Sequence, residues 1–223
     1  MQPSKFPEIC RLMELGEPVC ISFEAGEGEM GVGIEGKEWE GEAELSSFLF
    51  CELVQKARSG ETFRVSGQRC PAGAYVLGLS EQPPSEYYLK SGRYRDRETA
   101  EKAAAGLPRI ARKYGFMRIE PLSENRGKFD VLMLFLTPEG AMRVVQAFAY
   151  TEGARVSVDT IGAASICGDC TALALEKGLG LSFGCKGSRK HSGYRDTDLP
   201  LGIAFETVGS IENGLSELPE VRA

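Results

Sequence analysis

The sequence predicts an α+β or α/β fold with mixed sheets, and its hydrophobic pattern is the reason. Apolar side chains recur every three or four positions in residues 45–59 and 139–150, which indicates two amphipathic helices. Residues 130–137 form a continuous apolar run, which is typical of a central strand buried on both faces. Short β-type segments alternate with the helices, so we expect βαβ units.

The remaining elements follow from the same patterns. Glycines mark the ends of several helices, and short runs rich in valine, isoleucine, phenylalanine and threonine indicate strands. In chain order we expect helix 5–15, strand 18–23, helix 45–59, strand 62–66, helices 96–105 and 107–114, strand 117–121, strand 130–137, helix 139–150, strand 154–160, helix 171–177, strands 179–183 and 201–205, and helix 210–217.

Residues 24–44 separate the first strand from the first long helix and are rich in glycine and glutamate. They contain the pattern G-x-G-x-x-G at residues 31–36, but Glu38 stands where a phosphate-binding loop needs Ser or Thr. No helix is expected directly behind this loop, and its many carboxylates would repel a phosphate. We therefore expect a solvated excursion rather than a nucleotide site.

The order of elements suggests two similar halves within one domain. Residues 45–79 and 141–175 match element by element, as they would in a duplicated unit with pseudo-twofold symmetry or by chance similarity of αβ units. In a duplication, Cys70 and Cys167 would be equivalent and would meet at one site. The expected organisation is a single domain over 1–223, with a first half at 16–80, a connecting helical segment at 81–129, a second half at 130–205 and a C-terminal helix at 206–223.

The composition favours a soluble cytoplasmic protein without a nucleic-acid or membrane partner. The net charge of −6 argues against binding to nucleic acid or to an anionic membrane. No apolar run approaches the roughly 20 residues of a membrane helix, and residues 1–15 lack the apolar core of a signal peptide. A small molecule, a redox partner or a second copy of the chain is the kind of partner we expect.

The cysteines are the residues most suited to chemistry. Seven is an odd number for a disulfide scaffold, and in a reducing cytoplasm such residues are buried thiols, metal ligands or redox groups. Cys167, Cys170 and Cys185 follow strand-like segments and lie among glycines. We expect a cysteine-centred site there, although no reaction follows from the pattern and the chain is not assigned as an enzyme.

Cys70 is expected at the N-cap of a short helix. Pro71 suits the first helical position, which places the preceding cysteine at the cap. The positive end of the helix dipole, together with Arg69, is expected to lower the pKa of the Cys70 thiol.

Several local patterns together resemble one uncharacterised family. They are the helix that carries Cys51, the turn Arg69-Cys70-Pro71, and the segments 166–169, 182–189 and 196–203. In this order they resemble DUF169, a domain of unknown function that is common in methanogenic archaea and anaerobic bacteria, over roughly residues 18–205. The resemblance implies that four cysteines matter, namely Cys51, Cys70, Cys167 and Cys185.

The chain departs from the family pattern at two positions. Many relatives have a second cysteine where this chain has Ser188. Cys170 completes a local C-x-x-C that the family pattern does not contain.

A metal or iron–sulfur centre is the leading interpretation of these cysteines. Four thiolates satisfy tetrahedral zinc or a cluster, and Cys170 is a possible substitute for one of the four family cysteines. The anaerobic relatives implied by the resemblance favour an iron–sulfur cluster over zinc.

Two alternatives without a metal stay open. In the first, Cys167 and Cys170 form a redox dithiol, because they have the spacing of such a pair at a helix start. A catalytic Cys–His pair would have to use His191, the single histidine, which is expected to be a solvated loop residue. In the other alternative the cysteines are structural, and Lys186 and Arg189 bind a small anion.

Overall fold

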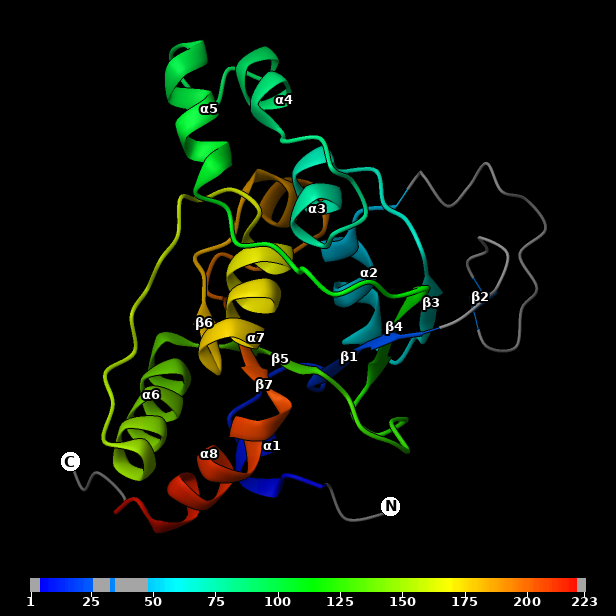
Figure 1. Ribbon diagram of the computed structural model, residues 1–223. Coiled ribbons are helices and arrows are strands. Elements are labelled where there is room, and N and C mark those ends of the chain that lie inside the picture. Colours follow the sequence, from blue (N-terminus) through cyan, green and yellow to red (C-terminus); the bar gives the residue numbers. More distant parts are fainter. Residues whose placement is uncertain (1–4, 26–32, 35–47, 220–223) are drawn as a thin grey trace.

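The structure, a computed structural model, describes residues 5–25, 33–34 and 48–219 (Figure 1). Apart from Gly33–Ile34, the G-x-G-x-x-G pattern and most of the Gly/Glu-rich stretch lie outside the described residues, as do the first positions of the helix expected at 45–59.

The described residues form strands of two to six residues and helices of five to fifteen residues. The strands are β1 (Val19–Glu24), β2 (Gly33–Ile34), β3 (Phe63–Val65), β4 (Phe116–Pro121), β5 (Val131–Leu136), β6 (Leu179–Leu181) and β7 (Leu199–Ala204). The helices are α1 (Pro7–Arg11), α2 (Phe50–Ala57), α3 (Pro71–Val76), α4 (Ser85–Lys90), α5 (Arg97–Ala105), α6 (Pro138–Glu152), α7 (Leu173–Lys177) and α8 (Phe205–Glu217), with π-helical segments η2 (Ser165–Ala172) and η3 (Gly187–His191). None of these helices is long and apolar enough to cross a membrane.

One sheet organises the described residues, in the strand order β2-β3-β4-β1-β5-β7-β6. Figure 1 shows α1, α6 and α8 on one side of this sheet and α2, α3 and α7 on the other. The fold is therefore α+β.

Strand pairing corrects the expectation of a mixed sheet, because every pairing among the described strands is antiparallel. β1 and β3 do run in the same direction, as a βαβ unit requires, but β4 lies between them and pairs antiparallel with both. β7 is inserted in the same way between β5 and β6. The inserted strands come from later in the chain, so the local order of elements did not reveal them.

The described residues show no internal repeat. Residues 154–160, expected as the counterpart of β3, form no strand and are mostly exposed. They carry the chain from α6 to η2 across the two helical layers (Figure 1). The valine alternation predicted extended backbone correctly, but a strand also needs a pairing partner. Residues 107–114 are likewise irregular rather than helical, and α4 forms in a stretch for which the sequence predicted no helix.

The central position of β5 confirms the prediction from its apolar run. Its odd-numbered side chains, from Val131 to Phe135, pack in the core shared with α2, α3 and η2. Its even-numbered side chains, from Leu132 to Leu136, pack in a second core shared with α1, α6 and α8. The sheet therefore separates two apolar layers, here called the η2 layer and the α6–α8 layer.

The segment η2 lies directly on β6 and β7 because each strand presents a glycine to it. A Cβ on Gly180 would lie 1.9 Å from the carbonyl oxygen of Asp169, and a Cβ on Gly202 would lie 1.7 Å from the carbonyl oxygen of Cys170. No side chain fits in either position. These two glycines thus allow the backbone of η2 to pack directly against β6 and β7.

Candidate functional site

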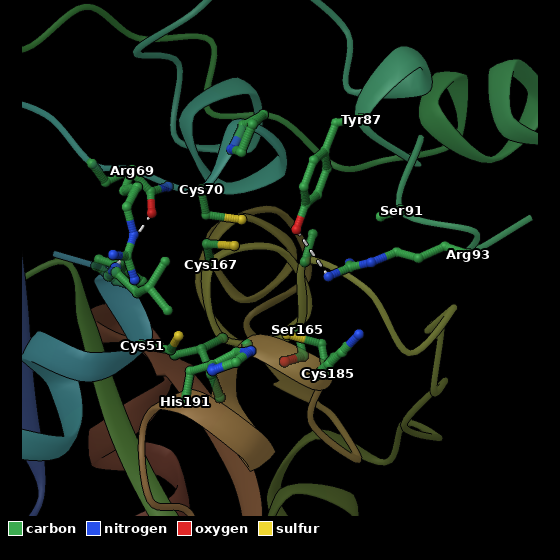
Figure 2. A pocket seen from close by; sticks show the side chains of 18 residues that line it. Cys51, Arg69, Cys70, Tyr87, Ser91, Arg93, Ser165, Cys167, Cys185 and His191 are labelled. Atoms are coloured by element: carbon green, nitrogen blue, oxygen red, sulfur yellow. Dashed lines mark hydrogen bonds between the residues drawn. The ribbon is translucent and has the colours of Figure 1, made fainter. Parts of the chain in front are cut away.

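The η2 layer contains a pocket of about 330 Å³ whose wall includes four cysteines. Figure 2 shows Cys70 and Cys167 on one side of this pocket, and Cys51 and Cys185 on the other. The rest of the wall is formed by Leu49, Phe50, Gln68, Arg69, Pro71, Tyr87, Ser91, Arg93, Ala164, Ser165, Ile166, Lys186, Gly187 and His191.

The pocket is built from the first turns of helical segments. Cys51 lies in the first turn of α2 rather than in the middle of the predicted helix, because α2 begins at Phe50. Cys70 is the N-cap of α3, as predicted, and Cys167 lies in the first turn of η2. Cys185 directly precedes the N-cap of η3. Backbone N–H groups in a first turn have no partner within the helix, so the pocket is rich in donors.

The four sulfurs influence one another electrostatically. In every pair of the four, the charge of one thiolate acts to raise the pKa of the other. A Cβ on Gly187 would lie 3.5 Å from the sulfur of Cys185 and 3.8 Å from that of Cys51, so the backbone at the start of η3 lies close to both sulfurs. No three His, Cys, Asp or Glu side chains in the described part of the chain lie close enough together to hold one metal ion.

Cys185 is the pocket thiol whose pKa is lowered. Burial raises its pKa, but hydrogen bonds from Ser165 and Ser188 outweigh burial and favour the thiolate. Ser165 is the first residue of η2, so one of these donors is a free N–H of a helix end. The Ser165 hydroxyl is fully buried, and the described group to which it donates is the sulfur of Cys185.

Hydrogen bonds also form at the Cys70 and Cys51 sulfurs, but burial dominates. Burial raises the pKa of Cys70, although the N–H groups of Gly73 and Ala72 act in the opposite direction, so the predicted lowering is wrong. Burial raises the pKa of Cys51 to about 12, against a hydrogen bond with the Ser192 hydroxyl, which lies 3.2 Å from the sulfur. The dipole of a short helix does not offset the desolvation of a thiolate.

Cys170 does not line the pocket. Its sulfur is completely buried and donates to the carbonyl oxygen of Pro200 at 3.3 Å, on the sheet side of η2. Three residues make less than one turn of a π-helix, so Cys167 and Cys170 point in different directions. Of the cysteines outside the family motifs, Cys20 is buried in β1 and packs in the α6–α8 layer, where Cys10 of α1 also packs.

The basic residues predicted to bind an anion divide between two roles. Lys186 lines the pocket. Arg189 does not, because its guanidinium donates to the carbonyl oxygens of Phe183 and Asp198, each at 2.7 Å, and to that of Arg195. Arg189 therefore holds the loop between β6 and β7 in place.

Two further pocket cations, Arg69 and Arg93, were not identified as ligand-binding residues from the sequence. Arg93 follows α4 by a few residues and lines the pocket. No sequence pattern links it to the cysteines. The described wall contains two arginines and one lysine but no Asp or Glu.

A buried ion pair fixes the loop that carries Cys185. Arg58 of α2 donates to the Asp198 carboxylate at 2.9 Å, and both side chains are almost completely buried. Arg195 donates to the same carboxylate at 2.8 Å. Although burial raises the pKa of Asp198, the hydrogen bonds from these two guanidinium groups lower it below its ordinary value.

Asp169 joins η2 to the end of β6. Its carboxylate accepts hydrogen bonds from the hydroxyls of Ser182 at 2.5 Å and Thr160 at 2.6 Å. Burial raises the pKa of Asp169 to about 6 in spite of these donors. Ser182 also accepts from the N–H of Gly184, so this contact positions the backbone just before Cys185.

The chain is similar to known proteins over most of its length. The model of the family DUF169, described as "Uncharacterised ArCR", matches residues 9–214, which include all four pocket cysteines. A relative named "Uncharacterized protein MJ0308", from Methanocaldococcus jannaschii, is 28% identical over 180 residues, which cover 77% of this chain and 77% of the relative. No solved structure matches the chain.

Proposed function

The chain belongs to the DUF169 family, and we propose that it binds an iron–sulfur cluster through Cys51, Cys70, Cys167 and Cys185. The observation that carries the proposal is that these four thiols come from four separate segments and line one pocket. The cysteines on α1 and β1 and the one on the sheet side of η2 do not line it.

The spread of the thiols favours a cluster over a single ion. One tetrahedral zinc ion contacts thiolates at about 2.3 Å, so its sulfur ligands lie only about 4 Å apart. The described cysteines do not form such a tight group. In a [4Fe–4S] cluster each cysteine binds a different iron, so the four ligands surround a larger volume. Thiols placed around a pocket of about 330 Å³ suit this second arrangement.

The surroundings of the sulfurs support the same proposal. Cluster thiolates are tuned by hydrogen bonds to sulfur and by nearby charge. Donors act on Cys51, Cys70 and Cys185, and the pocket cations offset negative charge. A bound cluster would also offset the cost of ionising buried thiols, because ligand cysteines must lose their protons.

Anaerobic purification of the full chain tests the proposal. We expect iron, acid-labile sulfide and visible absorption near about 400 nm. Cys51→Ser, Cys70→Ser, Cys167→Ser and Cys185→Ser should each reduce the iron and sulfide content, whereas Cys10→Ser and Cys170→Ala should leave both unchanged. A folded protein without iron, or with one zinc ion and no sulfide, would contradict the cluster.

A further inference from the structure

We propose that the same pocket binds a small organic anion beside the thiols, held by Arg69, Arg93 and Lys186. The proposal goes beyond cluster binding and does not depend on it, because it rests on the charged and donor groups of the wall. The ligand class is a carboxylate or phosphate with a small apolar body.

The charge of the pocket is the first argument. The chain carries a net charge of −6, yet the described pocket wall has three cations and no carboxylate. None of the three forms an ion pair with a described carboxylate. Elsewhere guanidinium groups are commonly paired, as for Arg97 with Glu86, Arg109 with Glu81, and Arg112 with Asp130. Unpaired cations in a concave site favour a negatively charged ligand.

Arg93 is held in place without a carboxylate. Its guanidinium donates to the Tyr87 hydroxyl at 3.1 Å and lies 5.1 Å from the centre of that ring and 5.6 Å from that of Tyr88. A guanidinium group has five N–H donors, so most of those on Arg93 stay free for a ligand. An arginine fixed in this way loses little side-chain entropy when it binds an anion.

A neutral polar group of the wall points to the same kind of ligand. The side-chain amide nitrogen of Gln68 is buried and has no hydrogen-bond partner among the described residues, although the amide oxygen accepts from the N–H of Phe50. This nitrogen is a donor, so it favours a ligand that carries an acceptor atom. Such a group is costly to bury unless a ligand or water satisfies it.

The apolar part of the wall indicates that the anion is organic. Leu49, Phe50, Pro71 and Ile166 lie on the same wall as the cations. Apolar surface with a few converging polar groups is typical of a small-molecule site. A ligand with a charged group toward Arg93 and a small apolar body against these side chains fits this arrangement.

Benzoate and benzamide provide a test, because they share a shape and differ in charge. Calorimetry on the purified full chain should show benzoate binding at least about tenfold more tightly than benzamide. Arg93→Gln should remove this preference, whereas Arg95→Gln, a matched change of an exposed arginine nearby, should preserve it. Phenyl phosphate separates the two anion classes: tighter binding than benzoate identifies a phosphate site, and weaker binding a carboxylate site.

Alkylation of Cys185 in metal-free protein gives a second measurement that does not require high affinity. The thiolate displaces iodide from carbon, so a sulfur–carbon bond forms while the carbon–iodine bond breaks. Anionic iodoacetate and neutral iodoacetamide both react in this way. We expect the rate ratio of iodoacetate to iodoacetamide to be several-fold higher at Cys185 than at Cys10, and Arg93→Gln should abolish the difference.

Two results would overturn the anion proposal. One is equal rate ratios at the two cysteines together with no preference for benzoate; the cations would then only balance thiolate or cluster charge. The other is an equal effect of Arg95→Gln and Arg93→Gln. Iron content is measured separately. An iron-free protein that prefers benzoate supports anion binding and contradicts only the cluster. An iron-loaded protein without this preference supports the cluster and contradicts anion binding.

Discussion

The two helical layers of the sheet differ in the regularity of their helices. The α6–α8 layer has helices of 15 and 13 residues, and α6 is capped by Thr137 at its start and by left-handed Gly153 at its end. Here Gly214 of α8 lies against the backbone of α6, where a Cβ would come within 2.7 Å of the Ala147 carbonyl oxygen. The η2 layer instead contains short helices and a π-helical segment, and their first turns form the pocket wall. Regular helices satisfy their own backbone groups, whereas the irregular layer leaves donors for ligands.

Two cysteines show the chemical result of this difference. Cys20 faces the regular layer, and burial, followed by the charge of Glu120, raises its pKa far above the ordinary value. Cys185 is also largely buried, but donors from Ser165 and Ser188 lower its pKa. Burial alone makes a thiol inert, and donors at a helix start make it a potential ligand or nucleophile.

The largest expected effect comes from breaking the ion pair that supports the irregular layer. Asp198→Asn leaves Arg58 buried without a full counter-charge, and we expect a loss of about 3–5 kcal/mol in the free energy of unfolding at pH 7. Urea denaturation measures this loss. Asp196→Asn, a change in the same loop at an exposed residue, should cost less than about 0.5 kcal/mol.

The Asp198 effect should depend on pH in a defined direction. The folded-state pKa of Asp198 is lowered, so its stabilising contribution is complete above the unfolded-state pKa of about 3.9 and is lost as the pH falls through the folded-state value. The stability difference between the wild type and Asp198→Asn should therefore shrink below about pH 4. A constant difference down to about pH 2 would contradict the ion-pair explanation.

A smaller loss is expected when η2 is pushed away from the sheet. Gly202→Ala places a methyl group on the Cys170 carbonyl oxygen, and we expect a destabilisation of about 3 kcal/mol together with lower iron content. Gly209→Ala on α8 is the matched control. Its Cβ would contact nothing, and removing a glycine from a helix should stabilise the protein by about 0.5–1 kcal/mol in the same denaturation assay.

Ser165→Ala should change the chemistry of the pocket more than its stability. It removes the hydroxyl donor, so the pKa of Cys185 should rise, and alkylation of metal-free protein should require a higher pH. The pH profile of the alkylation rate at Cys185 measures this shift. Ser216→Ala, near the end of α8, should leave the profile unchanged. If the profile of Ser165→Ala were unshifted, the lowered pKa of Cys185 would have to come from the other donors, namely the Ser188 hydroxyl and the backbone N–H groups of Ser165 and Ser188.

The smallest effect is expected in the segment that joins the two layers. Val158 is 49% exposed and belongs to no strand, so Val158→Ser should change the free energy of unfolding by less than about 0.5 kcal/mol. A loss above about 1 kcal/mol would indicate the paired strand that the valine alternation predicted.

Local patterns predicted the elements that depend on neighbouring residues. The apolar run of β5, the helix α6 with its terminal Gly153, and Cys70 followed by Pro71 at a helix start all have local physical causes, and the structure contains each of them. The resemblance to DUF169 also rested on local turns, and the match of the family model to residues 9–214 confirms it. In contrast, the insertion of β4 and β7 between same-direction strands depends on pairing across long stretches of chain.

The sequence by itself indicated an α+β or α/β protein, its family and a set of cysteines suited to chemistry, and the antiparallel pairing of the strands then decided for α+β. Only the tertiary structure decided which groups share a wall. It separated Cys170 from Cys167 by the turn of a π-helix and used Arg189 to hold a loop. It also brought Arg93 to the thiols and showed that burial outweighs a helix dipole at Cys70. Side-chain direction, desolvation and long-range proximity arise only when the chain is packed, so no local pattern encodes them.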